Sequence, residues 1–175
     1  EKEVIGRACA AMIDPNQSVI IDAGTTPYHV ARHLQEKSPQ IITNSLPVAQ
    51  LYASSPNVEL VLSGGVVYPR LGVLVGPMAI ESFAGMHADV AILSAGGITL
   101  EGLPTSHTLL VEIPVAMMRA AAKVVFCLDH TKFNRSSVAR LSSLDPVDAI
   151  VTDKGADSEL VRQLRARKLN VIIAD

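Results

Sequence analysis

The chain has 175 residues, enough for one full domain core and too few to make a second independent core expected. Hydrophobic residues make up 49% of it, charged residues 18% and aromatic residues only 3%, and 15 Lys and Arg stand against 17 Asp and Glu. The resulting net charge of -2 and the scarcity of aromatic rings argue against a domain that binds nucleic acid unaided, because such domains carry a basic excess or a surface for stacking bases.

The cysteines and the start of the chain indicate a cytoplasmic protein. Cys9 and Cys127 lie far apart in the sequence, and Cys127 falls within an apolar run, so two reduced thiols are expected. No apolar stretch approaches the roughly 18 residues that would cross a bilayer, so no membrane partner is expected. The chain starts at Glu1 without signal-peptide character and runs at once into a helical pattern, which predicts that a preceding segment has been removed.

Short aliphatic runs alternate with helical patterns along the whole chain. In chain order the predicted elements are a helix at 4–12, a strand at 19–22, a helix at 27–36, a strand at 40–44, a helix at 47–53, a strand at 58–63, a helix at 77–84, a strand at 89–94, an irregular loop at 96–108, a helix at 112–122, strands at 123–129 and 148–152, a helix at 157–168 and a strand at 170–174. Pro114 fits its helix only if that helix begins at about Glu112. Because the strands are apolar nearly throughout, the pattern predicts an α/β fold, a Rossmann-like parallel sheet covered by helices that forms a single domain.

The first predicted strand runs into Asp22-Ala23-Gly24-Thr25-Thr26, directly before a helix. Glycine lets the backbone approach a ligand, two hydroxyls accompany the free N–H groups of the helix start, and the helix dipole favours an anion there. The segment lacks the Gly-Lys-Ser/Thr of a Walker loop and the three glycines of the dinucleotide fingerprint. It therefore predicts a phosphate-binding turn of another kind.

Polar residues and glycines also follow the later strands, and ligands of open α/β sheets bind at this carboxyl edge. The ends are Thr43-Asn44-Ser45, Ser63-Gly64-Gly65, Ser94-Ala95-Gly96-Gly97 and Asp129-His130-Thr131-Lys132. Such a lining suits a polyhydroxylated anion, because sugar hydroxyls need paired donors and acceptors and Lys132 supplies a positive charge. The expected phosphate-binding residues are Gly24, Thr25, Thr26 and Lys132. The expected sugar-binding residues are Asp22, Asn44, Gly64, Gly65, Asp89, Gly96, Gly97, Glu112 and Asp129.

Each feature taken alone has a structural alternative. The Gly24 turn could be a simple helix cap, and the glycine pairs could be turns that need positive φ. Asp89 could cap the start of a strand, Glu112 could be a solvated carboxylate in the first turn of a helix, and Lys132 could be a surface charge. Their joint occurrence at successive strand ends favours the binding site.

Two histidines and a basic stretch are not assigned to the site. His29 and His33 stand four apart on one predicted helix, but no third ligand or general-base Glu accompanies them, so no metal is expected. The basic stretch at 162–168 is typical of a solvated helix end. No catalytic residues and no cofactor are assigned, and His107 and His130 are placed in loops that could touch a ligand.

Taken together, these motifs resemble the C-terminal domain of the DeoR/GlpR family of bacterial repressors from about residue 2 to the end of the chain. The matching segments are 20–26, 42–45, 62–65, Gly72, Gly76, 88–89, 96–98, Glu112, 129–133 and 151–153. The resemblance implies a fold shared with ribose-5-phosphate isomerase and coenzyme A enzymes, and a winged helix-turn-helix domain before residue 1. The chain departs from the family at Asp129-His130-Thr131-Lys132, where Asp-Ser-Ser-Lys is more usual, and at Pro114.

The resemblance implies a non-catalytic sensor whose phosphorylated sugar effector alters operator binding by the missing domain. A homodimer or homotetramer is expected, because palindromic operators match two-fold protein symmetry. An aldose-ketose isomerase on the same fold is the second hypothesis, with Glu112 or Asp129 as the carboxylate that moves the proton. A protein-interaction module with a vestigial pocket is the third.

Overall fold

The computed structural model describes residues 1–37 and 40–175. At its centre lies a seven-stranded sheet in the order β3-β2-β1-β6-β8-β10-β11, and every neighbouring pair is parallel. The strands are β1 (Ser18–Ile21), β2 (Gln40–Thr43), β3 (Leu60–Leu62), β6 (Ala88–Leu93), β8 (Ala121–Cys127), β10 (Ala149–Asp153) and β11 (Asn170–Ala174). The strand order changes direction between β1 and β6, which makes their carboxyl ends the topological switch point where ligands of such sheets bind.

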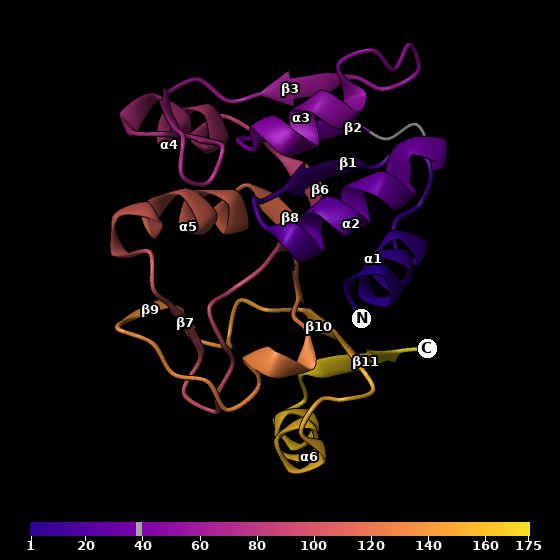
Figure 1. Ribbon diagram of the computed structural model, residues 1–175, viewed down its shortest axis with the longest axis vertical. Helices are drawn as coiled ribbons and strands as arrows, with labels where there is room; N and C mark the ends of the chain where they lie inside the picture. The colour runs from indigo at the N-terminus through magenta and orange to yellow at the C-terminus, as the bar shows by residue number, and fades with distance from the viewer. Residues whose placement is uncertain (38–39) are drawn as a thin grey trace.

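Helices cover both faces of this sheet, as the apolar strands predict (Figure 1). The covering helices are α1 (Lys2–Ala11), α2 (Thr25–Leu34), α3 (Leu46–Tyr52), α4 (Pro77–Ala84), α5 (Glu112–Arg119) and α6 (Ser158–Ala166). Two hydrophobic clusters result, one under α1, α2 and α3 and the other under α4, α5 and α6. The side chains of β1 alternate between them, Val19 and Ile21 entering the first and Ile20 the second. The predicted fold class is confirmed.

Local chemistry explains some of the helix ends. Ser45 caps α3 by accepting from the Val48 amide, and Asp157 caps α6 by accepting from the Leu160 amide at 2.6 Å. Helix α5 begins at Glu112, as Pro114 requires. It ends at Arg119, three residues before the predicted end at 122, because Ala121 already pairs with Ala88 of β6. Alanine has a low preference for strands, so the end of α5 and the start of β8 at Ala121 depend on pairing with β6.

The sequence patterns missed four short strands in two antiparallel pairs. One pair is the hairpin of β4 (Val66–Tyr68) and β5 (Val73–Val75), and the other joins β7 (Leu103–Thr105) to β9 (Ala139–Ser142). Short 3-10 turns at Gln35–Lys37, Thr108–Leu110 and His130–Lys132 complete the described elements. The predicted loop at 96–108 thus contains β7 and leads into one of these turns. No described helix has both the length and the apolar character that a bilayer crossing needs.

Candidate functional site

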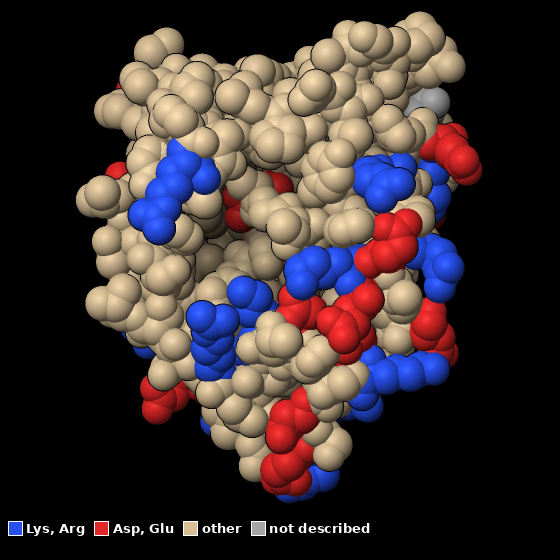
Figure 2. Space-filling view, in the orientation of Figure 1, with Lys and Arg blue, Asp and Glu red and all other residues tan. Residues whose placement is uncertain are grey.

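A cavity of about 750 Å³ opens at the carboxyl ends of β1, β2, β6 and β8, at the switch point of the sheet. Figure 2 shows a hollow on this face, with acidic atoms inside it and Lys and Arg side chains around it. Eight of the residues expected in the binding site line the cavity. They are Asp22, Gly24, Thr25, Thr26, Asn44, Gly96, Asp129 and Lys132.

The turn after β1 presents the start of α2 to the cavity. Gly24 precedes the helix with φ 131° and ψ 160°, a conformation that residues with a side chain rarely adopt. The first N–H groups of a helix have no partners within it, and no side-chain cap hydrogen bond is formed at this helix start in the described chain. Thr25 is exposed and Thr26 is buried beside these amides. The ten-residue helix therefore aims unsatisfied donors and the positive end of its dipole into the cavity.

Asp22 is a buried carboxyl at the end of β1. Its Oδ1 accepts from the Ala23 amide at 2.7 Å, and only 9% of the residue is exposed. Burial raises the pKa of Asp22 to about 7, because the backbone donors of Ala23 and Ser94 only partly offset the cost of desolvating the charge. A neutral Asp22 can donate a hydrogen bond to a ligand oxygen, whereas the ionised form would repel an anion.

Asn44, directly after β2, uses only one side of its amide group in hydrogen bonds to the described residues. Its Nδ2 donates to the Leu74 carbonyl oxygen at 3.0 Å, which fixes the amide against β5. Its Oδ1 is buried and has no hydrogen-bond partner among the residues that the structure describes. Because an unpaired buried acceptor is costly, a ligand hydroxyl donating to Asn44 would remove this cost.

Asp129 lies at the end of β8 with 1% exposure and is fully engaged. Its carboxylate accepts from the Thr131 amide at 3.0 Å and from the Thr131 hydroxyl, and it forms an ion pair with Lys2 Nζ at 2.8 Å. Burial raises the pKa of Asp129, but Lys2 and Thr131 together outweigh it and hold this pKa below its ordinary value. Asp129 is therefore the ionised partner of Lys2, and half-buried Lys132 beside it on the cavity wall supplies a further positive charge.

Five of the expected site residues lie away from the cavity lining. Gly64 donates from its amide to Ser82 Oγ at 3.0 Å, and Gly65 packs so closely on β5 that a Cβ would lie 2.6 Å from the Val75 carbonyl oxygen. A Cβ on Gly97 would lie 2.0 Å from the Arg135 carbonyl oxygen. Gly65 and Gly97 allow close backbone packing, and among the three only Gly65, with φ 128°, has the positive φ of the turn alternative considered for them.

Asp89 and Glu112 also lie elsewhere. Asp89 is the second residue of β6, at the amino end of the sheet, where it accepts from the Ser18 amide at 2.7 Å and the Ser18 hydroxyl at 2.8 Å. These donors hold the pKa of Asp89 below its ordinary value. Glu112 is exposed in the first turn of α5. Asp89 thus belongs to the edge opposite the cavity, and a contact between it and a ligand bound there is ruled out by its position.

Sequence reasoning missed residues that other elements bring to the cavity. Lys2 comes from α1, Arg70 from the β4–β5 hairpin, and Thr105 and Ser106 from the end of β7. Ser94 directly follows β6, so its place at a strand end was a usable signal. The others lie on elements whose positions depend on packing, and no local pattern marks them.

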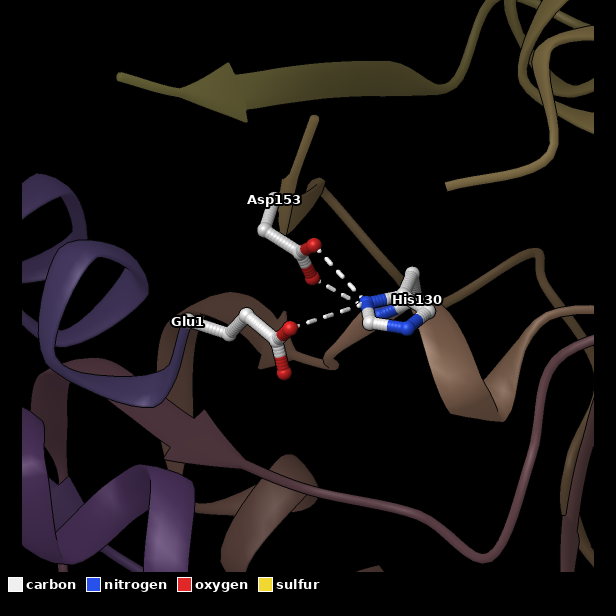
Figure 3. Close-up of side chains that lie close together, drawn as sticks. All are labelled: Glu1, His130 and Asp153. Carbon is white, nitrogen blue, oxygen red and sulfur yellow. Dashed lines mark hydrogen bonds and ion pairs between the residues drawn. The ribbon is translucent and has the colours of Figure 1, made fainter. Parts of the chain in front are cut away.

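His130 stands beside the cavity wall in a cluster with Glu1 and Asp153, which Figure 3 shows. Its Nδ1 lies 2.9 Å from Asp153 Oδ2 and 3.9 Å from Glu1 Oε1. Asp153 also accepts from the amides of His130 at 2.7 Å and Gly155 at 3.1 Å. Burial raises the pKa of Asp153, but these amides and the imidazole together hold it below its ordinary value. The hydrogen bonds to Asp153 explain this group, and we assign no metal to it.

Comparison with known families agrees with this geometry. A family model described as the DeoR C terminal sensor domain matches residues 1–154. The chain belongs to this family. The DeoR sensor domain is 30% identical to the HTH-type transcriptional regulator GolR of Listeria innocua, over the whole chain and 70% of that protein. It is also 30% identical to the HTH-type transcriptional repressor GlcR of Bacillus subtilis, over 88% of the chain and 60% of that protein. The L-fucose operon activator of Escherichia coli matches at 30% identity over 87% of the chain and 63% of its own length.

Solved structures place the DeoR sensor domain in the ribose-5-phosphate isomerase-like fold. Ribose 5-phosphate isomerase from Plasmodium falciparum superposes with a TM-score of 0.54 at 13% identity, over 75% of the chain and 52% of the isomerase. The eIF2B delta protein from Chaetomium thermophilum superposes with a TM-score of 0.58 at 16% identity, over 85% of the chain and 55% of that protein. At these identities the likeness shows the fold.

Proposed function

We propose that this DeoR sensor domain binds a phosphorylated sugar in the cavity and thereby changes operator binding by a winged helix-turn-helix domain in the whole protein. The chain spans 60% to 70% of the length of GolR, GlcR and the L-fucose operon activator, and GolR and GlcR are named as HTH-type regulators. Such a regulator acts in the cytoplasm, where its operator lies. Effector coupling needs only different affinities of the effector for the two states, typically about 1 to 3 kcal/mol.

The observation that carries this proposal is the start of α2 in the wall of a polar cavity. Gly24, Thr25 and Thr26 offer amides and hydroxyls to an anion, and Lys132 lines the same cavity. The free acceptor of Asn44 suits a sugar hydroxyl, and the protonated form of Asp22, which its raised pKa of about 7 favours, suits a phosphate oxygen. We assign the phosphate to the turn and Lys132, and the sugar to Asp22, Asn44 and Gly96.

An isomerase is the competing function, because the fold is shared with ribose 5-phosphate isomerase. The two carboxylates first considered for proton transfer do not support it. Glu112 is exposed and outside the cavity lining, and Asp129 is held ionised by Lys2 with its pKa below the range of a general base at neutral pH. Asp22, with its pKa raised to about 7, is the one carboxyl on the described cavity wall whose pKa suits proton transfer.

Thermal unfolding and product analysis on the same samples test the proposal. We expect at least one of ribose 5-phosphate, glucose 6-phosphate and fructose 6-phosphate to raise the melting temperature, since a ligand at 100 times its Kd adds about 2.7 kcal/mol. The unphosphorylated sugars should have no effect. Absence of stabilisation by any sugar phosphate would favour the interaction module, and appearance of the isomeric sugar phosphate would establish an enzyme.

We propose a homodimer or homotetramer, matching the two-fold symmetry of palindromic operators. Light scattering of the chain at several concentrations tests this directly. A particle mass near 18.6 kDa at all concentrations would show that these residues do not associate by themselves.

A further inference from the structure

The amino end of α1 reaches into the cavity, although the helix packs mainly against α2. Lys2, the first residue of α1, lines the cavity together with the Gly24 turn, and its Nζ lies 2.8 Å from Asp129 Oδ2. The Lys2 side chain is 37% exposed, whereas that of Asp129 is 2% exposed. An ammonium carries three donors, so Lys2 has donors beyond the one that Asp129 receives.

The residue before it contacts the same region of the sheet. Glu1 approaches the imidazole of His130, which immediately follows Asp129 and is hydrogen-bonded to Asp153 at the end of β10 (Figure 3). Two consecutive residues at the start of α1 therefore meet the residues that follow β8. A ligand that altered the surroundings of Asp129 would therefore also alter the contacts made by the start of α1.

Helix α1 is also held firmly against α2, whose first turn forms the anion site. Gly6 lies so near α2 that a Cβ there would be 2.8 Å from the backbone carbon of His29. Glu3 accepts from His29 Nδ1 at 2.6 Å and lies 2.9 Å from His33 Nε2. Ile5 and Cys9 of α1 are fully buried in the hydrophobic cluster under α1, α2 and α3. The position of Lys2 relative to Gly24, Thr25 and Thr26 is thus fixed by helix packing.

Several cations line the cavity proposed for the anion, and they are Lys2, Arg70 and Lys132. A sugar phosphate carries roughly -1.5 to -2 at neutral pH, and the start of a helix supplies only about +0.5. Lys132 adds one positive charge, which brings the balance to between about 0 and -0.5, and Arg70 also lines the cavity, so the choice of Lys2 rests on its geometry. Lys2 is the cation that already meets a buried carboxylate on the cavity wall, so it can bridge Asp129 and a phosphate without leaving its ion pair.

We propose that Lys2 is an effector-binding residue that bridges the ligand phosphate and Asp129 and so ties α1 to the occupied site. This inference rests on the proposed function, because it needs an anion in the cavity. Binding then draws the start of α1, the start of α2 and the end of β8 onto one ligand. The start of α1 is then held more tightly when an effector is bound than when the cavity is empty.

Calorimetric titration of the 175-residue chain with ribose 5-phosphate and with inorganic phosphate tests the role of Lys2. Lys2→Gln should weaken phosphate binding by about ten- to hundredfold, and Lys2→Arg should restore most of it, because a charged donor to phosphate is lost and then regained. Lys123→Gln, at an exposed position near the amino end of β8, is the matched control and should bind as the wild type does. Equal affinities of Lys2→Gln and wild type for both probes would overturn the inference.

A double variant removes the ambiguity of a buried, unpaired carboxylate. If Lys2→Gln fails to fold, Lys2→Gln with Asp129→Asn removes both charges and should fold while still binding phosphate weakly. Wild-type affinity in the double variant would overturn the inference while leaving the proposed function standing. Absence of phosphate and sugar-phosphate binding by the wild type would overturn both.

Hydrogen exchange of α1 supplies a second measurement that a purely structural Lys2 would leave unchanged. Phosphate should slow amide exchange over the first turn of α1 in the wild type, and this protection should vanish in Lys2→Gln at a phosphate concentration that saturates the variant. Protection of equal size in both proteins would show that Lys2 does not transmit occupancy and would overturn the inference.

Discussion

The ends of β1 and β8 each place a buried aspartate on the wall of one cavity, yet the pKa values of the two carboxyls shift in opposite directions. Among the residues that the structure describes, Asp22 receives backbone donors alone, so burial raises its pKa to about 7. Asp129 has Lys2 and both donors of Thr131, so its pKa lies below the ordinary value despite burial. The difference shows that a buried carboxyl keeps its charge where a cation accompanies it, and holds its proton to a higher pH where only backbone dipoles do. The protonated form of Asp22 can therefore donate a hydrogen bond to an anion in the cavity, while Asp129 holds the Lys2 ammonium beside the same cavity.

Asp22→Asn tests the neutral side of this comparison and should have the largest effect on stability. The unfolded carboxyl loses its proton near 3.8 and the folded one near 7, so the wild-type free energy of unfolding should fall as pH rises between these values. The variant lacks this loss and should exceed the wild type by up to about 4 kcal/mol at pH 8, since each pKa unit corresponds to about 1.4 kcal/mol. Urea unfolding at pH 4 and pH 8 measures it. Parallel pH profiles for the two proteins would contradict the assignment.

Asp129→Asn tests the ionised side and should destabilise the domain by about 1 to 3 kcal/mol, because it removes an ion pair whose partner Lys2 is partly solvated. The sign with pH is opposite to that of Asp22. The stability that Asp129 provides is present above its unfolded pKa and is lost as pH falls through the lower folded pKa. Urea unfolding from pH 2 to pH 7 should show the two proteins converging in acid. A constant difference down to the lowest pH would contradict the ion-pair explanation.

Lys132→Ala separates binding from folding within the same cavity. Effector binding should weaken about tenfold, as expected for loss of one charged phosphate contact, while the free energy of unfolding should change by less than about 0.5 kcal/mol. Calorimetric titration with ribose 5-phosphate and urea unfolding of the same preparations measure both. An unchanged Kd would remove Lys132 from the site.

Asp89→Asn is the smallest expected change and tests the opposite edge of the sheet. Because Asp89 meets Ser18 at the amino end of β6, its substitution should leave the Kd for ribose 5-phosphate within about twofold of wild type. Stability should fall by about 1 kcal/mol through weaker hydrogen bonds to the Ser18 amide and hydroxyl. A tenfold change in Kd would mean that this edge communicates with the cavity.

The sequence sufficed for the fold and for one side of the site, because both are written in local patterns. Aliphatic runs separated by helical patterns specify a helix-covered parallel sheet, and the glycine and threonines after β1 must lie at its carboxyl edge. The same rule, applied strictly, would have excluded Asp89, since it opens its strand instead of closing it.

The remaining features depend on packing between distant segments. Lys2 precedes β1 by more than a dozen residues and reaches the cavity only because α1 lies against α2. Arg70 arrives on a hairpin of two short strands that periodicity does not reveal. Gly97 shares its motif with the cavity residue Gly96, and only the position of the Arg135 carbonyl group distinguishes them.

Because glycine has no side chain, Gly6 lets α1 lie close to α2, and this contact determines how α1 can respond when Lys2 binds a ligand. Helix α1 has ten residues and is about 15 Å long. Gly6, near the middle of α1, lies directly against the backbone of α2. A displacement at Lys2 would therefore be passed on to α2 through this close contact. Any larger residue at this position would push α1 away from α2 and weaken this route between Lys2 and α2.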